Sequence, residues 1–260
     1  MTSHLVRLEL KPGLARHLKA GHPWLFKKGL EDIPKIPAGS VVDLVDQGRF
    51  VARGYFDPYS AIAVRVLTRR PSEVIDSGFF ANRIQECFDA RQRQLDLTDT
   101  NAYRLVHGEG DGLPGVIVDL YAGWAVLKLY SAGLTPHRPL IVEALRKAVP
   151  GLKGVVGRDE VGRDDAEIDE AKGSAKTLWG GEAPQPVEIL ERGVKFAVDV
   201  YTGQKTGFFL DQRDNRQLLR HFVRDKSVLN AFCYTGGFLT GHPVDFELYA
   251  VLHHAPCGRI

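Results

Sequence analysis

Gly203-Gln-Lys-Thr-Gly-Phe-Phe-Leu-Asp-Gln-Arg-Asp-Asn-Arg216, followed by Val228-Leu-Asn-Ala-Phe-Cys-Tyr-Thr-Gly-Gly-Phe238, is the most informative stretch of this 260-residue chain. Residues 211–222 predict a helix, and residues 227–232 form a short apolar run typical of a strand at the centre of a parallel sheet. A helix, a buried strand and a turn that ends in two glycines together favour an α/β sheet open to a ligand at its carboxyl edge.

The predicted helix has a start signal and an apolar side. Asp211 or Asp214 can cap its first turn. Leu218, Leu219 and Phe222 recur at helical spacing and are predicted to be its buried side.

The turn after the strand can hold a ligand. Gly236 and Gly237 allow the backbone to approach a group that any Cβ would block. Polar side chains, Lys205 and those of residues 211–216, surround the apolar Phe208-Phe209-Leu210, which suits a pocket for an adenine and its sugar. The alternatives from the residues alone are a common structural turn and a capped helix start with exposed charge pairs.

Size and composition are those of a soluble protein of one to three domains, with 44% hydrophobic and 25% charged residues. The sequence shows no apolar run that could span a bilayer and no signal peptide, so no membrane partner is expected. Three cysteines, Cys87, Cys233 and Cys257, match neither a zinc site nor a disulfide framework. A cytoplasmic location is therefore predicted, with Cys87 a small buried thiol.

Residues 1–70 predict a small β-barrel, because short alternating segments are separated by tight turns. This region holds 12 lysines and arginines against 6 acidic residues, a net charge of +6, whereas the whole chain carries +2. A basic first domain is typical of a protein that binds polyanions, with an ordinary solvated surface as the alternative.

Residues 71–186 predict a central α+β domain. Residues 79–97 and 140–149 are expected to be helices, and residues 159–186 an acidic, irregular connector. Residues 187–200 read as a hairpin that turns at Arg192-Gly193.

These motifs resemble the class I S-adenosylmethionine-dependent rRNA methyltransferases, and among them the large-subunit rRNA cytosine-C5 methyltransferases. The resemblance covers residues 1–238, and residues 204–216 and 230–238 carry most of it. Gly21-His-Pro-Trp-Leu-Phe26 and Arg53-Gly-Tyr-Phe-Asp-Pro58 are similar to the family's N-terminal PUA domain, an RNA-binding barrel, and Leu105–Asp119 to its central domain. The implied fold class is α/β plus β: a PUA-like β-barrel (1–70), a central α+β domain (71–186) and the start of an incomplete Rossmann-like methyltransferase domain (187–260).

The resemblance also implies site residues for S-adenosylmethionine and for large-subunit rRNA. The cofactor would be held by Phe209, Asp211, Gln212, Arg213, Asn230, Ala231, Phe232, Cys233, Tyr234, Thr235, Gly236 and Gly237. The RNA phosphates would be contacted by Lys11, Arg16, Lys19, His22 and Lys27. The aromatic residues Trp24, Phe26, Tyr55 and Phe56 could stack bases, with core packing the favoured role for Trp24 and Phe26.

Residues 239–260 depart from the family pattern. We recognise no Asp-Pro-Pro-type loop and no late cysteine nucleophile, so no catalytic residue is identified and a frameshift or truncation after residue 238 is our hypothesis. His253, His254 and Cys257 offer three donors without a known metal frame, and no metal is predicted. The chain is expected to bind the cofactor weakly or not at all and to be inactive in methyl transfer, and the alternative function is a non-catalytic RNA-binding remnant. The target nucleotide and the oligomeric state, including a homodimer, are left open.

Overall fold

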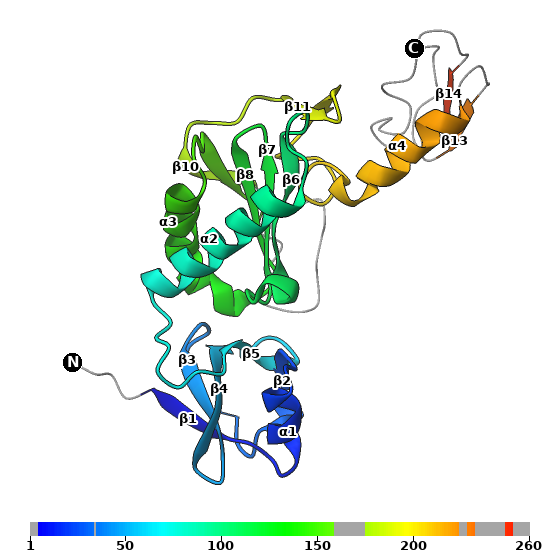
Figure 1. The fold of residues 1–260 in the computed structure, drawn as a ribbon. Helices are drawn as coiled ribbons and strands as arrows, with labels where there is room; N and C mark the ends of the chain where they lie inside the picture. Colours follow the sequence, from blue (N-terminus) through cyan, green and yellow to red (C-terminus); the bar gives the residue numbers. More distant parts are fainter. Residues whose placement is uncertain (1–4, 34, 159–174, 224–227, 232–247, 252–260) are drawn as a thin grey trace.

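A computed structural model describes residues 5–33, 35–158, 175–223, 228–231 and 248–251. They form an N-terminal domain, a central domain and a C-terminal segment (Figure 1). Within these ranges, no helix combines the length and the apolar character that a bilayer-spanning helix requires.

The N-terminal domain is a five-stranded sheet with one short helix. Its elements are β1 (Val6–Glu9), α1 (Leu14–Lys19), β2 (Trp24–Phe26), the 3₁₀ turn η1 (Lys27–Gly29), β3 (Val41–Asp46), β4 (Arg49–Phe56) and β5 (Ile62–Thr68). The strand order is β1-β3-β4-β5-β2, with β1 parallel to β3 and the other neighbours antiparallel. Gln47 and Gly48 both have positive φ, as a tight turn between β3 and β4 requires.

The predicted barrel does not close among the described residues. The sheet edges β1 and β2 are only four and three residues long. A single antiparallel bridge, Leu10 to Leu30, joins the segments that follow them. Pro12-Gly13 turns the chain away immediately after this bridge, so the two edges are too short to pair along their length.

The central domain is a mixed sheet with two helices on one face (Figure 1). Its elements are α2 (Ser77–Gln94), β6 (Ala102–His107), η2 (Gly108–Asp111), β7 (Val116–Tyr121), β8 (Trp124–Leu129), η3 (Ala132–His137), α3 (Arg138–Ala148), β9 (Gly154–Gly157) and β10 (Lys176–Gly180). The strand order is β10-β9-β8-β7-β6. Only β8 and β9 are parallel, because α3 carries the chain back across the sheet between them. The strand β10 lies in the stretch expected to be an irregular connector, so that prediction was wrong for residues 176–180.

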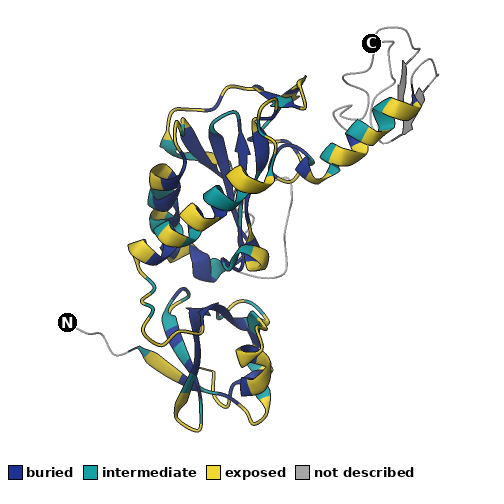
Figure 2. Ribbon diagram, viewed as in Figure 1, coloured by how far each residue is buried: buried dark blue, intermediate teal, exposed yellow. Residues whose placement is uncertain are grey.

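Both faces of the central sheet are buried, which explains the apolar composition of its strands (Figure 2). Phe80 and Ile84 of α2 pack with Leu105 on the helix-covered face. The hairpin of β11 (Val187–Glu191) and β12 (Val194–Val198) covers the other face together with Phe208. The hairpin prediction is confirmed, including its turn at Arg192-Gly193, where both φ angles are positive.

The C-terminal segment comprises η4 (Leu210–Gln212), α4 (Arg213–Phe222), β13 (Val228–Ala231) and β14 (Leu248–Val251). The strands β13 and β14 are parallel, as is typical of an α/β sheet, and β14 lies within residues 239–260, where the sequence predicted no element. The start of α4 differs from the prediction, because its N-cap is Gln212 and no side chain caps it. Leu218 and Phe222 are 56% and 69% exposed, so the predicted buried side was wrong for these two residues, whereas Leu219 is half-buried.

Buried hydrogen bonds join the N-terminal and central domains. The Tyr55 hydroxyl donates to the Pro114 carbonyl oxygen at 2.8 Å. Arg65 donates to the Ser131 hydroxyl at 3.0 Å. His137 Nε2 lies 2.8 Å from the Gly39 carbonyl oxygen, to which it donates. Because these groups are buried, separating the domains would leave several polar groups unpaired, so the interface fixes their relative position.

The buried His137 predicts a pH-dependent stability. Burial lowers the pKa of this imidazole below its ordinary value of about 6.5, although the Gly39 carbonyl opposes the shift. As pH falls below about 6.5, the unfolded chain takes up a proton that the folded chain resists, so the free energy of unfolding decreases. We expect His137→Gln to reduce this dependence between about pH 6.5 and 5, measured by urea unfolding.

The control is His221→Gln, which removes an exposed histidine on α4. An equal pH dependence in the wild type and the His137→Gln variant would contradict the assignment.

Candidate functional site

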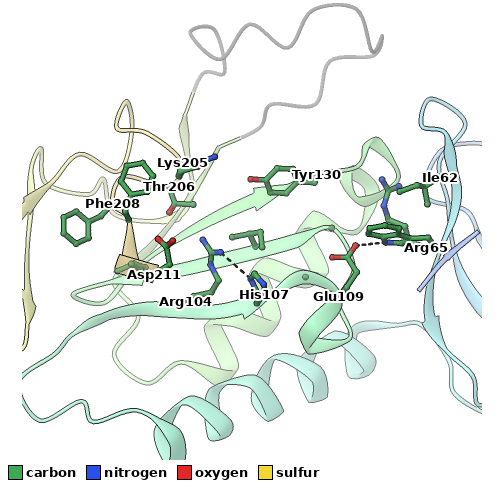
Figure 3. A pocket seen from close by; sticks show the side chains of 16 residues that line it. Ile62, Arg65, Arg104, His107, Glu109, Tyr130, Lys205, Thr206, Phe208 and Asp211 are labelled. Atoms are coloured by element: carbon green, nitrogen blue, oxygen red, sulfur yellow. Dashed lines mark hydrogen bonds between the residues drawn. The ribbon is translucent and has the colours of Figure 1, made fainter. Parts of the chain in front are cut away.

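A cavity of about 640 Å³ lies where three parts of the chain meet (Figure 3). The N-terminal domain contributes Trp24, Ile62 and Arg65, and residues 205–211 form much of the opposite wall. The floor comes from the central sheet, through Arg104, His107, Glu109, Ile117 and Tyr130. Its volume lies within the ~300–1,000 Å³ range of small-ligand sites.

The loop before the cavity is held by its own hydrogen bonds. The Asp199 carboxylate accepts from the backbone N–H groups of Tyr201 and Thr202 at 2.8 and 2.9 Å. A Cβ on Gly207, whose φ is +128°, would lie 2.8 Å from the Asp199 carbonyl oxygen. Only glycine fits there without displacement, so the sequence Gly-Gln-Lys-Thr-Gly holds the loop in one conformation.

A buried carboxylate ties this loop to the central sheet. Asp119 on β7 is fully buried and accepts from Arg104 Nε and Nη2 at 2.8 and 3.0 Å. The Thr206 hydroxyl also donates to Asp119, at 2.5 Å, and lies 2.8 Å from the Tyr121 hydroxyl. The hydrogen bond to Asp119 raises the pKa of Arg104, and burial raises the pKa of Tyr121. The guanidinium therefore stays charged and the phenol stays neutral at physiological pH.

A second buried pair anchors α4. Arg216 donates to both oxygens of Glu191 on β11, each at 2.7 Å, and its guanidinium lies 4.4 Å from the ring centroid of Phe208. Arg213, predicted to contact the cofactor, donates to the Ala102 carbonyl oxygen on the edge strand β6 at 2.7 Å. Two arginines of the motif thus fasten α4 to the central domain.

The remaining predicted cofactor residues fall into three groups. Phe209, half-buried, and Asp211, exposed, line the cavity. Gln212 lies at the start of α4 and donates to Asp211 at 3.2 Å. Asn230 and Ala231 end β13, at the carboxyl edge where parallel sheets bind ligands. Phe232, Cys233, Tyr234, Thr235, Gly236 and Gly237 lie outside the described residues.

Most of the predicted RNA-binding residues are exposed around α1. Lys11, Arg16, Lys19 and His22 are exposed, and Lys27 on η1 is half-buried. A groove of about 480 Å³ runs beside α1, with Lys11 and His22 among its lining residues.

Sequence reasoning missed His17 and Lys28, which line the same groove. The nearby basic residues Arg16 and Lys27 were the signal that could have found them.

The burial of the four aromatic residues considered for base stacking differs from the prediction. Tyr55 and Phe56 are fully buried and cannot stack bases. Phe26 is 39% exposed and Trp24 is partly exposed, so neither is a core residue. Trp24 Nε1 donates to Glu109 at 2.8 Å, which places the indole between the groove and the larger cavity.

The cavity residues Arg104, His107 and Tyr130 were not predicted. They come from β6 and from the end of β8, and no spacing along the chain links them to the 203–216 motif.

Cys87 is buried as predicted, and burial together with the nearby Asp111 raises the pKa of its thiol to about 11. A thiol that stays protonated at neutral pH is a poor nucleophile. The described ranges also contain no group of side chains that could hold a metal ion. Cys257, His253 and His254 lie outside those ranges.

Comparison with known families agrees with this architecture. A profile described as a PUA-like domain matches residues 8–69. A profile described as an S-adenosylmethionine-dependent methyltransferase matches residues 103–243, more than half of the chain. The chain belongs to this methyltransferase family. S-adenosylmethionine is accordingly the cofactor of the family.

Similar proteins carry more specific names. The chain is 43% identical over 237 residues to "Ribosomal RNA large subunit methyltransferase I" of Shewanella denitrificans, which covers 90% of this chain and 59% of that protein. It is 39% identical over 231 residues to the protein of the same name from Alteromonas mediterranea, covering 88% and 57%. The chain therefore spans about three-fifths of the length of these relatives.

Two solved structures are similar as well. One is a putative methyltransferase from Streptococcus mutans, with a TM-score of 0.75 and 25% identity, covering 94% of this chain and 63% of that one. The other is a putative methyltransferase complexed with SAH, with a TM-score of 0.76, 25% identity and coverage of 94% and 62%.

The described residues fit the family's cofactor. Its adenosyl group needs an apolar surface beside polar groups, and Phe209 next to the exposed carboxylate of Asp211 provides both on one wall of the cavity. The parallel pair β13 and β14 provides the start of the sheet edge where such ligands bind.

The buried pair of Arg216 and Glu191 predicts a large effect of mutation on α4. Arg216→Met leaves Glu191 buried with only Arg213 nearby, at 3.8 Å. Breaking a buried ion pair costs about 3–5 kcal/mol. We therefore expect the amide hydrogens of α4 to exchange faster in the Arg216→Met variant than in the wild type.

The matched control is Arg192→Gln, because Arg192 and its partner Asp214 are 44% and 87% exposed. An exposed pair contributes about 0–1 kcal/mol. Equal effects of the two substitutions would contradict the anchoring role.

Proposed function

We propose that this chain forms the RNA-binding part and the opening of the cofactor site of a large-subunit rRNA methyltransferase acting on cytosine C5. The observation that supports this most is the likeness of about 40% identity over about nine-tenths of the chain to proteins of that name. The cavity supports it further, because it lies between the basic N-terminal domain and the methyltransferase motif.

Each part of the chain has a role in this proposal. S-adenosylmethionine, when bound, supplies an electrophilic methyl group. Phe209, Asp211 and the backbone at Asn230–Gly237 would hold it, and the basic surface around α1 would bind RNA phosphates. The hydrogen bonds of the buried Asp119 to Arg104 and Thr206 hold the Lys205–Asp211 wall against the central sheet, which supports a fixed cofactor wall in this proposal.

A second candidate function is RNA binding without methyl transfer. Cytosine C5 is a weak nucleophile, and its activation in this family requires a thiolate that adds at C6. Cys87 does not fit this role, because it is buried and its pKa is raised to about 11. Cys233 lies in the predicted cofactor loop, so its position does not fit this role either.

Binding of S-adenosylmethionine tests the proposed function. Isothermal titration of the full chain is expected to detect binding, and Asp211→Asn is expected to weaken it about tenfold through loss of a charge-assisted acceptor. Asp214→Asn, an exposed aspartate on α4 that does not line this cavity, is the control. Undetectable cofactor binding alongside retained RNA binding would favour the second candidate.

The basic surface predicts salt-dependent RNA binding. Each phosphate contact to a single strand contributes about 0.7 to the slope of log affinity against log salt concentration. Replacing Lys11, Arg16 and Lys19 by Gln is expected to lower that slope by about 2 in filter-binding titrations.

The control is Lys147→Gln, which removes an exposed lysine from α3. An unchanged slope in the triple variant would place the RNA on another surface.

A further inference from the structure

The cavity contains an exposed aromatic ring that the fold does not require. Tyr130 follows β8, and its backbone N–H donates to the Gly115 carbonyl oxygen at 2.9 Å. Its ring is 51% exposed and lines the cavity. The Lys128 ammonium lies 5.0 Å from the ring centroid. An exposed tyrosine ring that lines a cavity can serve as a stacking platform for a base.

Cations lie around this ring (Figure 3). Lys205 is exposed and has a φ of +60°, an unfavourable conformation for a lysine, and the bonded loop at Asp199–Gly207 holds it there. Arg104 is 38% exposed although Asp119 binds its guanidinium, and His107 Nδ1 lies 3.4 Å from it. Of the two acidic side chains that line the cavity, Glu109 accepts a hydrogen bond from Trp24 and Asp211 is exposed.

The cavity also adjoins the basic groove of the N-terminal domain. Trp24 lines both this cavity and the groove beside α1 that contains Lys11 and His22. A strand bound by its phosphates in that groove would lie against Trp24, which also forms part of the cavity wall. The predicted cofactor residues Phe209 and Asp211 lie on the opposite wall, in the segment before α4.

We propose that the cavity is a subsite for an unpaired RNA nucleotide, whose base stacks on Tyr130 and whose phosphate binds Lys205 and Arg104. This inference rests on the proposed function and adds that the RNA nucleotide bound in the cavity is unpaired. Proteins read single-stranded RNA by stacking its bases on aromatic rings, whereas paired bases stay within the helix and cannot enter such a cavity. The subsite therefore selects single strands over duplexes.

The test uses the full chain and a fluorescein-labelled oligouridylate of about ten nucleotides, followed by fluorescence anisotropy. Tyr130→Leu is expected to weaken binding about fivefold or more with an unchanged salt slope, because it removes stacking but no charge. Lys205→Gln is expected to weaken binding and to lower the salt slope by about 0.7, the value for one phosphate contact.

Matched controls are Tyr59→Leu and Lys195→Gln. Tyr59 is 47% exposed on the N-terminal domain, and Lys195 is 70% exposed on β12. Both controls are expected to bind the oligouridylate like the wild type.

Three results would overturn the inference. The first is a wild-type chain that does not bind the oligouridylate. The second is an equal loss of affinity for an RNA duplex of the same length in the Tyr130→Leu variant. The third is a Tyr130→Leu variant that binds S-adenosylmethionine more weakly but binds RNA like the wild type, which would assign the Tyr130 side of the cavity to the cofactor. By contrast, the expected RNA effects in a chain that binds no cofactor would support the subsite and count only against the proposed function.

Discussion

The carboxylate of Asp119 lies fully buried in the middle of β7, where an unpaired charge would strongly destabilise the fold. It is satisfied by Arg104 from the neighbouring strand and by Thr206 from a loop that lies 87 residues later in the chain. The methyltransferase motif is therefore bonded to the interior of the central sheet at Asp119, in addition to the bond of Arg213 to the edge strand β6. The bond to Asp119 sets where Lys205, Phe209 and Asp211 stand, and hence the wall of the cavity.

The rest of the architecture supports this arrangement. The central sheet needs cover on both faces, and the second face is covered by the β11–β12 hairpin and by Phe208 of the same motif. The edge strand β6 has its carbonyl groups at Ala102 and Arg104 occupied by Arg213 and Arg91. These arginines protect an edge that would otherwise pair with another strand, and one of them also fixes α4.

Local sequence predicted the elements that depend on neighbours along the chain. Apolar periodicity placed α2, and the Arg192-Gly193 pair placed the hairpin turn. Predictions from local sequence failed where contacts between residues far apart in the chain determine the structure. Leu218 and Phe222 have helical spacing, yet α4 is oriented by Arg216, whose partner Glu191 lies 25 residues earlier. The closed barrel was not found because its edge strands are short, and β10 formed by pairing with β9 despite its irregular sequence.

The candidate site divides in the same way. The sequence by itself determined the family and the basic charge of the N-terminal domain, and it predicted the cofactor motif, because glycine spacing and clustered polar residues are properties of short segments. Only the tertiary structure decided that Tyr130, Arg104 and His107 share a cavity with Lys205, and that Trp24 connects it to the basic groove. These side chains come from separate strands and domains, so their proximity depends on strand pairing and on the buried interface, neither of which any single segment encodes.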